Sequence, residues 1–257
     1  MHPTSLCGNG AALLLLGGFL LSACKGKQDP DPCAKQQPTT ADFVMYEELG
    51  YETNHGRVSR RYEVDTVAAS GMEGVTFAAR DTTALKYEWT FGNDPRVFTQ
   101  RNVFLTFNQA YGPVAVKLRV TKQPNTACFP ADNGTATAQK TLVVLTRQQA
   151  PLYGSYEGYN LSNPSRKFTV HLQFNSLLNM PEGSTYDLRN EVHMGSTALC
   201  LSSGTVDPPI GAAALTGFAA LDRQNKRKLT FDYSCYDLRH PGPNWPIITD
   251  TFVGYRK

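Results

Sequence analysis

The stretch LKYEWTF, residues 85–91, decides the expected fold because its side chains alternate between apolar and polar. Leu85, Tyr87, Trp89 and Phe91 lie on one face of an extended chain, and the charged residues lie on the other. A period of two is typical of a β-strand with one buried face. The stretch therefore predicts a strand that places large aromatic side chains in a core.

The segments around this stretch repeat the same pattern. Alternating or continuous apolar runs occur at GVTFAA (residues 74–79), VAVKLRV (114–120) and KTLVVL (140–145). Turn-forming clusters separate them, such as GNDP at 92–95 and DNGT at 132–135. No segment shows a sustained helical period, so several short strands predict an all-β sandwich.

The segment YEWTFGNDP, residues 87–95, resembles the polycystic-kidney-disease (PKD) domain. The hallmark of that family is an aromatic residue, Trp, an acidic residue and then Phe-Gly-Asp. The matching residues are Trp89, Phe91, Gly92, Asn93 and Asp94, whereas Thr90 replaces the usual Asp. AYGPVAVKLRVTK (110–122) is similar to the family's Gly-x-Tyr-x-Val-x-Leu-x-Val segment. The resemblance covers about residues 42–145 and implies an Ig-like sandwich domain at 42–147, followed by a second domain at 151–257. It also implies a spacer or a protein- or glycan-contacting module without catalytic residues of its own.

The second half follows a short joint, QQAP (148–151), and also reads as β-structure. KFTVHLQF (167–174), KLTFDYSC (228–235) and ITDTFVGYRK (248–257) are alternating segments. About seven or eight strands in sequence order predict an antiparallel β-meander or a lipocalin-like barrel. GSYEGY (154–159) and the terminal FVGYRK resemble the small C-terminal β domains that follow PKD-like modules in lipoproteins of the Bacteroidetes group.

The N-terminal segment predicts where the protein resides. An apolar run at residues 11–21 is shorter than the roughly 20 residues that span a bilayer, and it ends in LSAC (21–24), which resembles a bacterial lipobox. The resemblance implies a signal peptide at 1–23, lipid attached to Cys24 and a polar tether at 24–41. We expect attachment to the bacterial cell envelope, at the outer membrane, facing either the periplasm or the exterior. No Lys or Arg precedes the run, which leaves the position of the start Met open.

Of the six cysteines, Cys7 lies in the expected signal peptide and Cys24 in the lipobox. The remaining four suggest disulfides, because an even number in an exported chain is typical of oxidised pairs. Of the three possible pairings, the spacing favours Cys33–Cys128 and Cys200–Cys235. The absence of CxxC and of cysteine–histidine spacing predicts no metal site and no cofactor. A formal net charge of +3, with RVSRR (57–61) as the one dense basic cluster, predicts no nucleic-acid partner and a solvated loop or strand edge for that cluster.

The remaining functional signal is aromatic. Tyr and Trp are enriched where a surface meets a ligand, and the candidates here are Trp245, Tyr236, Tyr153 and Tyr159. No nucleophile motif is present, so we expect no enzyme. The favoured function is an envelope-anchored lipoprotein with a binding or structural role toward a protein or glycan. The alternatives are an accessory carbohydrate-binding lipoprotein of a polysaccharide-uptake system and, third, an envelope hydrolase with a Ser–His pair or carboxylates in a deep pocket.

Overall fold

The computed structural model describes residues 31–53, 56–69, 74–108, 111–172, 177–179, 185–187, 192–202, 216–236 and 246–257. The chain divides into two units, Met1–Gln36 and Gln37–Lys257. The regular structure described in the second unit is all-β, apart from one short turn of 3-10 helix, η1 (Arg147–Gln149). The expected all-β, sandwich-like fold is confirmed.

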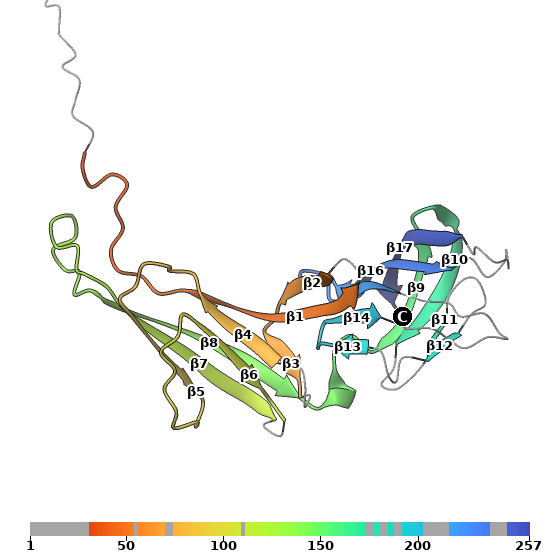
Figure 1. The fold of residues 1–257 in the computed structure, drawn as a ribbon, viewed down its shortest axis with the longest axis horizontal. Coiled ribbons are helices and arrows are strands. Elements are labelled where there is room, and N and C mark those ends of the chain that lie inside the picture. Colours follow the sequence, from red (N-terminus) through yellow and green to blue (C-terminus); the bar gives the residue numbers. More distant parts are fainter. Residues whose placement is uncertain are drawn as a thin grey trace, which may run out of the picture. The chain divides into compact units, whose positions relative to one another are not determined.

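The first half of the second unit consists of two four-stranded sheets (Figure 1). One sheet has the order β2-β1-β4-β6, formed by β2 (Gly56–Glu63), β1 (Phe43–Thr53), β4 (Gly74–Ala79) and β6 (Asn102–Thr106). The other has the order β3-β8-β7-β5, formed by β3 (Thr66–Ala68), β8 (Thr135–Leu145), β7 (Gly112–Thr121) and β5 (Lys86–Phe91). All pairs are antiparallel except β3 with β8, which are parallel.

The sandwich core is centred on Trp89, which is fully buried. Its indole N–H donates to the carbonyl oxygen of Gln100 at 2.9 Å, so the polar atom of this side chain is satisfied. Phe43 packs edge-on against the indole with ring centroids 5.2 Å apart. The predicted inward face is correct for Tyr87, Trp89 and Phe91 but wrong for Leu85, which is 75% exposed because β5 begins one residue later.

The second half contains a seven-stranded antiparallel sheet with the order β10-β9-β17-β16-β15-β14-β13. Its strands are β10 (Asn163–Leu172), β9 (Gly154–Asn160), β17 (Ile247–Arg256), β16 (Lys228–Tyr236), β15 (Thr216–Leu221), β14 (Ala198–Ser202) and β13 (Val192–Met194). A separate hairpin pairs β11 (Leu177–Asn179) with β12 (Thr185–Asp187). In the described strands β10 and β13 are the two ends of an open sheet, so this half is a meander rather than a closed barrel.

The two faces of this sheet differ. One face, which we call the inner face, carries a buried cluster that includes Tyr156, Val170, Leu229, Phe231 and Phe252. The opposite, outer face carries the alternate residues of each strand. Because neighbouring strands are in register, the outer residues form rows that run across the sheet.

The β1–β2 hairpin belongs to both halves. Phe43 and Met45, near the start of β1, are part of the sandwich core. Leu49, four residues further along, is 2% exposed and packs with Cys200 and Phe218 on the outer face of the seven-stranded sheet. Figure 1 shows β1 running on from β4 toward β14. One strand therefore supplies side chains to two apolar clusters.

One of the two expected disulfides is present. Cys33 and Cys128 are joined, as the spacing predicted. Cys200 and Cys235 are thiols instead, so that pairing was wrong.

The sheet explains this outcome. Cys200 pairs across β15 with Phe218 and then Asp232, so it lies on the outer face, whereas Cys235 lies in the inner cluster. Their strands are separated by β15, hence by about 10 Å, and a disulfide needs Cα atoms within about 7 Å.

Candidate functional site

The predicted ligand-binding aromatics fall in different environments. Trp245 lies outside the described residues, as does the lipid-attachment residue Cys24. Tyr236 ends β16, and its side chain is also outside the description. Tyr153 is half-buried against the inner cluster of the sheet, whereas Tyr159 is half-buried on the outer face. The structure therefore separates Tyr153 from Tyr159 rather than combining them in one site.

Tyr159 lies in a row of outer-face residues that crosses four strands. It is directly opposite Lys167 on β10 and Val253 on β17, and Val253 is opposite Thr230 on β16. In the adjacent row Tyr255, which is 49% exposed, lies opposite Glu157 and Lys228. We call Tyr159, Val253, Tyr255 and their neighbours Lys167, Thr230 and Lys228 the outer-face patch.

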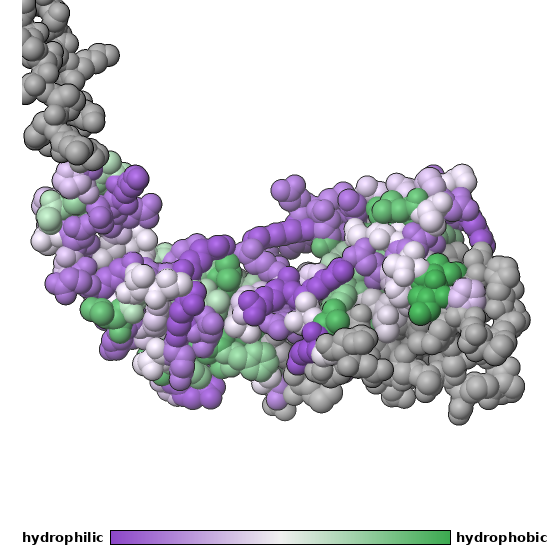
Figure 2. All heavy atoms as spheres, turned by 45° about the horizontal axis from the view of Figure 1, so that its top comes forward, coloured by the Kyte–Doolittle hydropathy of each residue, from purple (hydrophilic) through white to green (hydrophobic). Residues whose placement is uncertain are grey.

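The outer-face patch adjoins the hairpin interface. The row that contains Tyr159 continues from Thr230 to Ala220 and Ala198. These two alanines belong to the cluster under the β1–β2 hairpin. The patch is thus the uncovered continuation of a sheet face whose other end is already covered. On the side of the molecule drawn in Figure 2, hydrophilic residues cover much of the described surface and hydrophobic residues form separate areas.

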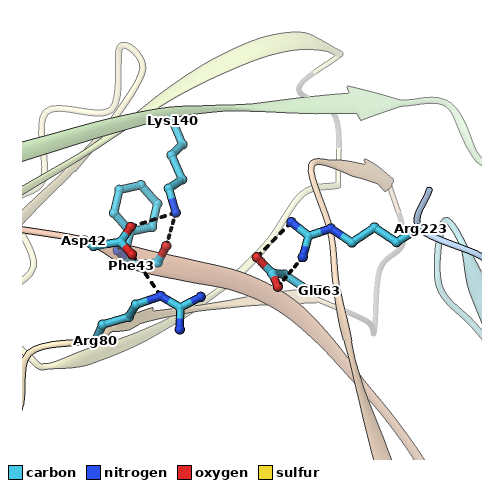
Figure 3. Close-up of polar contacts among 6 residues, drawn as sticks. All are labelled: Asp42, Phe43, Glu63, Arg80, Lys140 and Arg223. Atoms are coloured by element: carbon cyan, nitrogen blue, oxygen red, sulfur yellow. Dashed lines mark hydrogen bonds and ion pairs between the residues drawn. The ribbon is translucent and has the colours of Figure 1, made fainter.

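A second candidate is a hollow of about 280 Å³ at the base of the hairpin. It is lined by Arg61, Tyr62, Glu63, Val64, Asp65, Thr197, Leu221, Asp222, Arg223 and Lys226. The guanidinium of Arg223 donates two hydrogen bonds to Glu63, at 2.5 and 3.0 Å (Figure 3). Lys226 and Asp65 form an ion pair at 3.4 Å. The lining contains three basic and three acidic residues, so it carries no excess charge that would favour a charged ligand.

The basic cluster RVSRR is part of the same junction. It lies on β2, a strand at the edge of its sheet, as expected. Arg60 donates to Asp232 at 2.7 Å and lies over the ring of Phe218, 4.6 Å from its centroid. Burial raises the pKa of Asp232, but hydrogen bonds from Arg60 and Thr251 outweigh it and hold the pKa below its usual value. Arg60 of this basic cluster is therefore engaged in contacts within the chain.

Sequence reasoning missed Glu47, the most deeply buried acidic residue among those described. Only 2% of it is exposed, and its carboxylate accepts the backbone N–H of Ser196 at 3.0 Å and the hydroxyl at 3.3 Å. A Cβ atom on Gly195 would lie 2.3 Å from a carboxylate oxygen, so a larger residue there would displace the Glu47 side chain from these hydrogen bonds. The signal was available: Glu47 alternates with Phe43, Met45 and Leu49 on the apolar face of β1.

A second charged cluster fixes the start of β1. Asp42 forms ion pairs with Arg80 and Lys140, both at 2.9 Å, and Lys140 also donates to the carbonyl oxygen of Phe43 (Figure 3). Burial raises the pKa of Asp42, but the contacts with Lys140, Phe43 and Arg80 lower it by more. The pKa of Asp42 is therefore below its usual value. This cluster joins β1 to β4 and β8 and is structural.

Catalytic chemistry finds little support in the described residues. Ser155 and His171 are opposite each other on β9 and β10, with the hydroxyl oxygen 2.8 Å from Nδ1. A nucleophilic serine also needs a third group that orients the base, and in the described part of the chain no carboxylate is seen to accept a hydrogen bond from this histidine. Within the same ranges, no three His, Cys, Asp or Glu side chains are grouped as metal ligands. No helix among the residues with assigned structure is long and apolar enough to cross a membrane.

We compared the chain with protein-family models, curated proteins and solved structures, and none of the three comparisons gave a match. A functional assignment therefore rests on its own residues and geometry.

Proposed function

We propose that this chain is a cell-envelope lipoprotein with a non-catalytic binding or structural role. Cys24 carries the lipid, residues 24–41 form the tether, and a PKD-like sandwich supports the C-terminal sheet. The lipobox-like LSAC segment and the PKD-like YEWTFGNDP segment support the proposal from the sequence.

The observation that carries the proposal is the β1–β2 hairpin shared by the two halves. Leu49 is buried against the C-terminal sheet, and Glu47 binds the turn between β13 and β14. Three ion pairs surround these contacts, formed by Arg60 with Asp232, Arg223 with Glu63 and Lys226 with Asp65. Such a junction joins the C-terminal sheet to the sandwich through one shared hairpin, which suits a presenting or spacing role.

Lipid attachment provides the direct test. Cells that express the full chain are fed labelled palmitate, and the membrane fraction is assayed for label and protein. Cys24→Ser should lose both, because it removes the thiol that receives the lipid. Cys7→Ser is the matched control and should retain both. Labelling of Cys24→Ser at the level of the natural chain would refute the proposal.

The alternative role as an accessory carbohydrate-binding lipoprotein is favoured by one observation. The outer-face patch places Tyr159 and the exposed Tyr255 in adjacent rows of an open sheet. Aromatic side chains on a sheet surface offer contact area at low entropic cost.

A further inference from the structure

The outer-face patch is narrow, and its width limits what can bind there. Its apolar part consists of Tyr159, Val253 and Tyr255 on two adjacent strands, β9 and β17. A standard protein–protein interface buries about 800 Å² on each partner, whereas an aromatic side chain contributes at most roughly 150–250 Å². A stripe of this size fits a ligand about one ring wide rather than a folded partner.

Positive charge borders the stripe on both sides. Lys167 is exposed and lies opposite Tyr159, and the half-buried Lys228 lies opposite Tyr255. Among the described residues neither lysine is held in an ion pair. The one acid in these two rows, Glu157, lies 3.5 Å from Lys257. Asp222 also lies close enough to Lys228 for the lysine to help lower the pKa of that carboxyl. Three lysines, Lys167, Lys228 and Lys257, therefore face two acids, Glu157 and Asp222, and the remaining positive charge is complementary to an anionic ligand.

Hydroxyl groups add hydrogen-bonding capacity beside the stripe. Thr230 lies opposite Val253, and Thr169 lies opposite Glu157. Beyond Thr230 the row passes under the hairpin at Ala220, so the patch is bounded on that side by the existing interface. A ligand would therefore cross β16, β17, β9 and β10. Its acidic groups would lie near the two lysines, and the faces of its rings would lie over the two tyrosines.

We infer that the outer-face patch binds an acidic polysaccharide chain, with Tyr255 and Tyr159 contacting sugar rings and Lys167 and Lys228 pairing with carboxylate or sulfate groups. The inference rests on the proposed envelope function and specifies its partner.

The test measures binding of the full chain in detergent to polygalacturonate, alginate and chondroitin sulfate, with neutral pullulan as the comparison polymer. Tyr255→Ala should weaken acidic-polymer binding about tenfold, because an exposed aromatic anchor is lost. Lys167→Glu should weaken it by a similar factor and reduce its salt dependence. Both residues are surface-exposed, and thermal unfolding verifies that the variants are folded.

Two matched controls lie on the sandwich: Tyr111→Ala, where the tyrosine is 61% exposed, and Lys117→Glu on β7. Both should bind like the natural chain. Equal binding of pullulan, equal loss in the controls, or no binding to any acidic polymer would overturn the inference. None of these results affects palmitate labelling of Cys24, so failure of the polysaccharide site is distinguishable from failure of the lipoprotein proposal.

Discussion

Truncation of Leu49 should uncouple the hairpin from the C-terminal sheet. Leu49 is 2% exposed and contacts a cluster that includes Ala198, Cys200 and Phe218. Truncating a fully buried leucine to alanine loses buried apolar surface and leaves a cavity, and it lowers the free energy of unfolding by about 2–5 kcal/mol. The two neighbours Ala198 and Ala220 are too small to fill the space, so we expect about 3 kcal/mol for Leu49→Ala.

Urea unfolding followed by tryptophan fluorescence measures this loss, because Trp89 is buried in the sandwich. With a slope of about 3 kcal/mol/M for a chain of this size, the midpoint should fall by about 1 M. Val58→Ala is the control on the same hairpin: Val58 is 40% exposed, and its truncation should cost less than about 0.5 kcal/mol. Equal midpoints for the two variants would refute the shared-core interpretation of the hairpin.

Two other predictions concern the disulfide and acid stability. Reduction of the Cys33–Cys128 disulfide should lower the free energy of unfolding by roughly 4 kcal/mol, because the bond closes a long loop. In the control variant Cys128→Ala, addition of reductant should leave the free energy of unfolding unchanged. The folded pKa of Asp232 is below its usual value, so its contribution to stability is present above the unfolded pKa of about 3.9 and is lost as the pH falls through the folded pKa. Arg60→Ala should flatten this acid slope in urea titrations carried out between about pH 6 and pH 2, and an unchanged slope would contradict the role of the ion pair.

Much of the local structure was readable from the sequence. A period of two identified most of the strands and put Trp89 and Phe91 in a core, because the pleat alone sends alternate side chains to opposite faces. The spacing of the cysteines correctly predicted the Cys33–Cys128 disulfide, although the same reasoning gave the wrong result for Cys200 and Cys235. The charge of Glu47 within an apolar alternation is a further signal that the sequence itself contains, because a carboxylate on a buried face needs hydrogen-bond partners.

Other features depend on strand order and register, which arise from hydrogen bonds between residues distant in sequence. Alternation says which residues share a face within one strand, but it does not say which strands are neighbours. The order β16-β15-β14 places Cys200 and Cys235 on opposite faces and prevents their bond. The same long-range pairing places Tyr159 beside Val253 and buries Glu47 and Leu49 at the junction, so the local pattern determined the strands and only the tertiary structure decided the candidate site.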